Sequence, residues 1–212
     1  MNKLTICSFT IVMKQKINSA TLYAAALSTF AEYGYKKTTM EDIAGRLGMT
    51  KGNLYRYCRN KQDLYHNAVS HALLRWQNYV AQAIAGEDDA RRQFMVMCAR
   101  AIEYLSLDSD FRNVLIRDPD IFPLFPAADP FEEINRNSLL MARTVLQNGI
   151  TQRSFRDINP DATAEVLFLI YKMMIIRMYI HTDEKTVLET AEQAVDLLAN
   201  GLFKTKPSGG TQ

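Results

Sequence analysis

Apolar residues recur through most of the chain at the three- and four-residue spacing of helices with one buried face. In the first such segment Leu22, Ala26 and Phe30 share a face. Gly34 then suits a helix end, because glycine tolerates the left-handed conformation. Glycine and proline are sparse, and no internal repeat is visible. The pattern therefore predicts an all-α fold of about nine helices.

Polar capping residues predict where the first four helices begin, because their side chains satisfy free backbone N–H groups. Thr39 is followed three residues later by Asp42, which is a variant of the capping box. We expect the second helix to stop at Gly48, the third to end near Cys58 and the fourth to run to about Ala85. The four predicted starts are Asn18 or Ser19, Thr39, Thr50 and Asn60. Five further helices are predicted near residues 88–107, 109–117, 131–148, 160–181 and 184–203.

These helices divide into a three-helix head at residues 18–61 and a larger helical body at residues 62–204. Residues 1–17 are expected to form a frayed or disordered N-terminal extension, and residues 205–212 a disordered polar tail. Whether residues 1–12 belong to the native protein stays open, since Met13 is an alternative start.

Neither apolar stretch of the chain has the character of a targeting or membrane segment. Residues 4–13 are diluted by Thr, Ser and Cys and lack a convincing small-residue cleavage site. Residues 164–180 are interrupted by Lys172 and Arg177 and are slightly short to span a bilayer. We therefore predict a soluble, cytoplasmic protein without a membrane partner.

The small net charge of +2 hides an asymmetry between head and body. Residues 1–61 carry ten Lys and Arg against three acidic side chains, a net charge of +7. Residues 62–212 carry fifteen against twenty, a net charge of −5. A basic head on an acidic body suits a polyanion such as DNA, and a solvated basic face is the alternative.

Residues that could support catalysis or bind a metal are scattered along the chain. The three cysteines form no CxxC pair, and the three histidines have no metal-like spacing. The chain contains no nucleophile elbow, phosphate loop or adjacent acid–base pair. We therefore predict no catalytic residues, no metal, no cofactor and no enzymatic activity. The residues concerned are Cys7, Cys58, Cys98, His66, His71 and His181.

Two short helices separated by a glycine-containing turn, and preceded by a supporting helix, describe a helix-turn-helix. The second of them, at residues 50–57, carries Leu54 inward and mostly polar or aromatic residues outward. Such a helix fits the major groove of B-DNA, which is about 12 Å wide. Because it is too short to persist alone, the first and fourth helices must clamp it.

Residues 18–66 resemble the DNA-binding head of the TetR-type family of bacterial transcriptional repressors. The resemblance rests on the runs AALSTFAEYGY at 25–35, TTMEDIA at 38–44, LGMTKGNLY at 47–55 and NKQDL at 60–64. Cys58 departs from the family, in which an aromatic residue, usually phenylalanine, is common at this place. We expect the position to be buried, so the departure concerns local packing and leaves the assignment as it is.

The resemblance implies that several residues of the head contact the DNA backbone. Thr39, Tyr55 and Lys61 match the family's phosphate contacts, and Tyr57 is expected to face the backbone as well. Such contacts position the head without reading sequence. Two alternatives stay open: Thr39 as a helix cap only, and Tyr55 as part of the core.

Base reading is assigned to residues of the second short helix. Lys51 can donate to guanine, and Asn53 can pair with adenine, while Arg56 is a further candidate. Gly52 lets the helix approach the groove closely.

Specific operator binding generally requires two heads, so we expect a homodimer. The last two helices carry apolar stripes that suit a four-helix bundle between two subunits, the arrangement that the resemblance implies. The alternative is that both stripes belong to the core of one chain. The stripe residues are Leu167, Ile170, Tyr171, Met174, Met178, Leu188, Ala191, Val195 and Leu198.

Large apolar side chains of the body are expected to enclose a cavity for a small-molecule inducer, although such side chains are more often ordinary core. The proline-bracketed segment 119–130 is predicted as a lid, because its rings are too apolar for free exposure. The candidate lining residues are Trp76, Met97, Tyr104, Phe122 and Phe125.

Together these features predict a ligand-responsive transcriptional repressor. It would bind a palindromic operator in double-stranded DNA as a dimer and be released by a small lipophilic inducer. Activation in place of repression stays open, as do the inducer, the operator and the regulated genes. The alternative is a ligand-binding or protein-interaction module without sequence-specific DNA binding.

Overall fold

The computed structural model describes residues 17–118, 121–122, 129–180 and 184–203, with the backbone alone at 176–180 and 184–188. Every extended regular element in this part of the chain is a helix, which confirms the predicted all-α class. A single isolated bridge pairs Phe155 with Phe203. The helices are α1 (Ser19–Tyr33), α2 (Met40–Arg46), α3 (Lys51–Leu54), α4 (Lys61–Ala85), α5 (Ala90–Leu107), α6 (Ser109–Arg117), α7 (Glu132–Thr151), α8 (Pro160–Ile180) and α9 (Glu184–Leu202).

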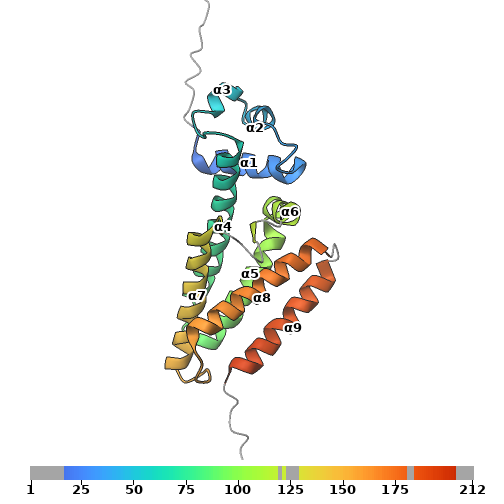
Figure 1. The fold of residues 1–212 in the computed structure, drawn as a ribbon. Coiled ribbons are helices and arrows are strands. Elements are labelled where there is room, and N and C mark those ends of the chain that lie inside the picture. Colours follow the sequence, from blue (N-terminus) through green and yellow to red (C-terminus); the bar gives the residue numbers. More distant parts are fainter. Residues whose placement is uncertain (1–16, 119–120, 123–128, 181–183, 204–212) are drawn as a thin grey trace, which may run out of the picture.

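The head and the body share one long helix (Figure 1). Helices α1, α2 and α3 gather at one end of the molecule, and the 25-residue α4 runs from them into the body. In the body, α4 packs against α5 and α7, and α8 packs against α7 and α9. Helix α6 contacts both α1 of the head and α8 of the body, so it links the two parts a second time.

The predicted helix starts are confirmed by side-chain caps. Asn18, Thr50 and Asn60 each accept a backbone N–H at the start of α1, α3 and α4. At α2, Thr39 and Asp42 form the reciprocal capping box. These bonds are local, so the sequence alone is enough to predict them.

The predicted end of the third helix needs correction. The α-helix stops at Leu54, and residues 55–57 continue as turns, with Arg56 N bonded to Asn53 O at 3.2 Å and Tyr57 N bonded to Leu54 O at 3.0 Å. The chain has no glycine or proline here, so nothing in the sequence marks the change from α-helix to tighter turns.

The core has two parts. The larger cluster is continuous from the head, through α4, to α6 and Phe122, and it includes Phe30, Leu54 and Trp76. The smaller cluster lies at the far end of the body, where Phe94 and Phe155 pack edge to face with ring centroids 6.2 Å apart. The head therefore shares one packed interior with α4, α6 and Phe122 of the body.

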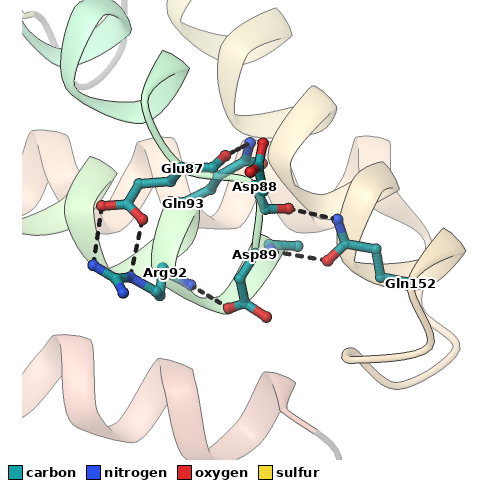
Figure 2. A network of polar contacts seen from close by, with 7 residues as sticks. Glu87, Asp88, Asp89, Arg92, Gln93 and Gln152 are labelled. Carbon is teal, nitrogen blue, oxygen red and sulfur yellow. Dashed lines mark hydrogen bonds and ion pairs between the residues drawn. The ribbon is translucent and has the colours of Figure 1, made fainter.

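Polar contacts close the far end of the body at the turn between α4 and α5 (Figure 2). Gln152, just after α7, accepts from Ala90 N and donates to Asp88 O, both at 2.9 Å. Glu87 pairs with Arg92 at 2.9 Å, and its backbone oxygen accepts from Gln93 at 2.6 Å. This network joins α5 to α7 by side chains that satisfy backbone groups at helix ends.

Gly149 in α7 gives a stability test of the far core. A Cβ at this position would lie 2.1 Å from the ring of Phe155, a fully packed side chain. We expect Gly149→Ala to lower the free energy of unfolding by about 1–3 kcal/mol through overpacking, measured by urea denaturation. Gly45→Ala is the control, because a Cβ there meets no atom within 4 Å and should not destabilise the protein. Equal stability of the two variants would contradict the packing described.

Candidate functional site: DNA interface and ligand cavity

The outer face of α3 and the turn after it is open to solvent. Lys51, Gly52 and Arg56 are exposed, and Tyr55 keeps 45% of its surface, while Leu54 is fully buried beneath them. A Cβ on Gly52 would meet no protein atom within 4 Å. This face is therefore accessible to the groove of a DNA duplex, with Asn53 half-buried at its edge.

Lys51 is held toward α2 by an ion pair. Its Nζ lies 2.7 Å from Oε1 of Glu41, and both side chains are exposed. The hydrogen bond from Lys51 lowers the pKa of the Glu41 carboxyl, and the same bond raises the pKa of Lys51. To contact a base, Lys51 would have to break its ion pair with Glu41. Glu41, the partner of Lys51, is a residue that the sequence pattern did not single out.

The hydroxyl of Thr39 is engaged within the capping box. It donates to Oδ2 of Asp42 at 2.7 Å and accepts from the backbone N–H of Asp42 at 3.2 Å. The bond from Thr39 lowers the pKa of the Asp42 carboxyl. The structure thus gives Thr39 the role of a cap, which is compatible with an anion at the same helix start.

Lys61 and Tyr57 lie in the framework of the head. Lys61 Nζ donates to the backbone oxygens of Tyr35 at 2.8 Å and Thr38 at 3.0 Å, and it lies 4.6 Å from the centre of the Tyr35 ring. This ammonium ties the start of α4 to the loop before α2, instead of projecting freely. Tyr57 is half-buried against the core, and Cys58 is buried as expected.

The body contains an apolar cavity bounded by α4, α5, α7, α8 and α9. Its volume is about 140 Å³, the size of cavities that hold a small apolar molecule rather than one ion. Of the described residues that line it, none is charged. An apolar ligand fits such walls because it leaves no buried charge without a partner.

Three of the five candidate ligand residues line the cavity. Trp76, Met97 and Phe122 line the cavity, and Trp76 is oriented by a 2.9 Å hydrogen bond from its Nε1 to Ala101 O. Tyr104 does not line it: its ring stacks against Trp76 with centroids 6.0 Å apart, and its hydroxyl donates to Asp108. Phe125 lies outside the described residues.

Burial raises the pKa of Tyr104 to about 12, and the nearby Asp108 carboxylate adds to this. Arg75 of α4 pairs with the same carboxylate at 2.5 Å. Asp108, four residues further along, and the ring of Trp76 on α4 hold Tyr104 in place, and they are the reason that its assignment to the cavity is corrected. Of the predicted lid at 119–130, the described Ile121 and Phe122 are each 2% exposed, packed against the body.

The predicted dimer stripes lie largely against the interior of their own chain. Six of the nine residues line the cavity of their own chain, and Ala191 is 1% exposed and lines a small adjoining space. Met178 and Leu188 lie outside the described side chains. For the seven described residues this favours the alternative that the stripes belong to the core of one chain. The six cavity residues are Leu167, Ile170, Tyr171, Met174, Val195 and Leu198.

A different apolar stripe faces outward on the same helices. Val166, Leu169 and Met173 on α8 are 50%, 57% and 51% exposed, and their spacing places them on one face. Leu197 on α9 is 72% exposed. The sequence reasoning missed this stripe because α8 is apolar on nearly all sides, so its period does not distinguish the inward face from the outward one.

Three polar residues of the cavity wall were missed as well: Gln77 on α4, with Asn135 and Ser138 on α7. Their signal in the sequence was weak, because a polar residue on an amphipathic helix is usually solvent-exposed. The spacing of Asn135 and Ser138, three residues apart, places them on the same face of α7.

The described helices include none long and apolar enough to cross a membrane. A helix-turn-helix head with an open recognition helix, joined by a shared helix to a body with an apolar cavity, defines a DNA-binding regulator with a sensory domain.

Comparison with known proteins specifies the class. Residues 22–68 match the family described as bacterial regulatory proteins, tetR family. The chain is similar to the transcriptional repressor KstR2 of Rhodococcus jostii, with 25% identity over 84% of this chain and 87% of that one. It is also similar to the uncharacterised HTH-type regulator YhgD of Bacillus subtilis, with 22% identity over 71% of this chain and 78% of that one.

Solved structures share the fold. FadR of Bacillus subtilis in complex with stearoyl-CoA superposes with a TM-score of 0.74 at 16% identity, over 87% of this chain and 99% of that one. This chain is a TetR-type transcriptional regulator. Since the relatives are regulators and not enzymes, the prediction that it is not an enzyme is confirmed.

The thiol of Cys98 reports on the apolar character of the cavity. Burial raises its pKa to about 12, so at pH 8 about one molecule in 10⁴ carries the reactive thiolate, against about one in four for an ordinary cysteine. We expect iodoacetamide to alkylate Cys98 at pH 8 at least about 100-fold more slowly in the folded protein than in urea. Peptide mass spectrometry, which separates Cys98 from Cys58, measures this. Equal rates would show that Cys98 faces water.

Proposed function

We propose that this regulator is a repressor that binds a palindromic operator as a homodimer and is released when a lipophilic ligand enters the cavity. The observation that carries the proposal is the position of α4. At its start Lys61 bonds to the loop before α2, and further along Leu73, Trp76 and Val80 line the cavity. One rigid element therefore belongs to both the DNA-binding head and the ligand site.

Coupling has a second route through α6. Phe122, which follows α6, lines the cavity and meets the Tyr171 ring edge to face at 6.4 Å. Helix α6 packs on α1 of the head, and Arg117 at its end lies close to Gly34. A ligand that displaces Phe122 would therefore shift α6 against the head. Because packed interiors tolerate few voids, such a shift moves neighbours as well.

The outward stripe of Val166, Leu169, Met173 and Leu197 supports the homodimer. Exposed apolar residues gathered on one face mark association surfaces, and Val166, Leu169 and Met173 share such a face of α8. Two copies joined there would present two recognition helices, and binding requires them to lie about 34–36 Å apart along one side of a duplex.

The relatives support a lipophilic ligand. FadR of Bacillus subtilis was solved with stearoyl-CoA, and a structure of KstR2 from Mycobacterium tuberculosis is described as a ketosteroid transcriptional regulator. Both share this fold, and the cavity walls here are apolar. Suppose that the binding free energy of the ligand differs by about 1–3 kcal/mol between two spacings of the heads. The ligand would then weaken the affinity for DNA roughly 5- to 150-fold. As a protein that acts on bacterial chromosomal DNA, the regulator is expected in the cytoplasm.

Gly52→Ala tests the DNA-binding role of α3. Because the new Cβ meets no protein atom, stability should be kept, while affinity for DNA should fall about tenfold, the scale of one lost base contact. The probe is a duplex selected from a random library with the wild-type protein, measured by fluorescence anisotropy. That selection should itself enrich sequences with two-fold symmetry.

Gly86→Ala, at the opposite end of α4, is the matched control and should bind like wild type. Unchanged affinity of Gly52→Ala, or failure of the selection to enrich any sequence, would refute the proposed contact.

Leu169→Glu tests the dimer surface. A charge in the centre of the outward stripe would be desolvated on association, so we expect the dimer to dissociate at micromolar concentration without loss of helix content. Sedimentation velocity and circular dichroism measure the two quantities. Leu74→Glu, on an exposed leucine of α4, is the control and should remain dimeric. A Leu169→Glu dimer as tight as wild type would exclude this surface.

A further inference from the structure

Three polar side chains lie together in the mostly apolar wall of the cavity, and we call them the amide strip: Gln77, Asn135 and Ser138. Gln77 Nε2 lies 2.6 Å from Ser138 Oγ, so the strip joins α4 to α7. Asn135 is 5% exposed, and it is among the few polar residues that are buried in the described chain.

The orientation of both amides follows from their partners. Gln77 Nε2 donates to the backbone oxygen of Ile134, and Asn135 Nδ2 donates to Oδ2 of Asp129 at 2.6 Å. A carbonyl and a carboxylate oxygen only accept, so each amide must place its nitrogen there and its oxygen on the other side. The amide oxygens of Gln77 and Asn135 are thus acceptors whose place is set by the fold.

Neither oxygen has a donor among the described residues. Both residues line the cavity, and neither oxygen is among the fully enclosed polar atoms that lack a partner. They can therefore be reached, and a ligand in the cavity can supply the missing donor. A ligand that supplies this donor is favoured over one that leaves the acceptor without a partner.

The surroundings of the strip disfavour an anionic head group. The described lining residues carry no charge, and the carboxylate of Asp129 lies behind Asn135. Lys172 lies beside the wall, with its Nζ 4.9 Å from the centre of the Phe168 ring, but it is not itself one of the lining residues. A carboxylate at the strip would face two carbonyl-type oxygens and would lose its hydration without meeting a cation of the wall.

We propose that the cavity takes an uncharged lipophile whose hydroxyl group donates a hydrogen bond to the amide strip. The inference rests on the proposed function of the cavity as the ligand site, and it specifies the chemical class that the site selects. The hydroxyl hydrogen goes to Gln77 Oε1 or Asn135 Oδ1, the hydroxyl of Ser138 can donate to the ligand oxygen, and the hydrocarbon lies against the apolar walls.

Trp76 makes the test direct, because it lines the cavity and is the only tryptophan of the chain. Three probes of equal chain length are titrated at pH 8 while Trp76 emission is followed: 1-dodecanol, its methyl ether and dodecanoate. We expect dodecanol to bind roughly 3- to 10-fold more tightly than the ether, the scale of one net hydrogen bond, and more tightly than dodecanoate.

The variant Gln77→Met keeps the length of the side chain and removes the acceptor, so the preference for the alcohol over the ether should shrink to about twofold or less. Gln147→Met makes the same change at an exposed position of α7 and should keep the wild-type preference. If Gln77→Met does not unfold cooperatively, Asn135→Leu removes the other acceptor and must give the same result.

Two other outcomes have different meanings. If the three probes bind equally well, or dodecanoate binds most tightly, the amide strip does not select a donor and the inference is overturned, while the cavity remains a lipophile site as proposed. If no probe changes Trp76 emission in the wild-type protein, the cavity does not take lipophiles of this size and both proposals are overturned.

Discussion

The recognition helix depends on the burial of one side chain. Helix α3 has four residues, and a helix of that length has no stability of its own in water. Leu54 is fully buried in the cluster that α1 and α4 share with it, and Thr50 caps its start. The outward face can be polar, and free for DNA, only because this inward anchor is supplied by other helices. The position of α3 therefore follows the position of α4.

The parts of the fold that depend on neighbours in sequence were predicted from sequence. The starts of α2, α3 and α4 were marked by Thr39, Thr50 and Asn60, because a cap bonds to backbone groups two or three residues away. The role of Lys61 was different. Its partners are the backbone oxygens of residues more than twenty positions earlier in the chain, so no local pattern shows that its ammonium is already engaged.

The body was predicted less completely, for physical reasons that particular residues illustrate. Trp76 and Phe122 were found because large rings usually mark an interior, but Tyr104 was misplaced because its ring stacks on Trp76, a residue far away in the sequence, while its hydroxyl bonds to Asp108. Leu167 and Leu169 both belong to a helix that is apolar on nearly every side, and only the packing shows that the first lines the cavity and the second is exposed. An apolar period reveals the buried face of a helix only where the opposite face is polar, and α8 is apolar on nearly every side.

The continuity of the larger core cluster bears on how ligand and DNA would affect each other. Phe30 and Leu54 of the head belong to the same cluster as Trp76 and Phe122, two side chains that line the cavity. A dense interior does not deform gradually, so filling the cavity would favour one arrangement of α4 and α6 over another rather than loosen both. Under the proposed function, the arrangement that DNA selects must then disfavour the ligand by the same factor as the ligand disfavours DNA, because the two equilibria share one coupling free energy.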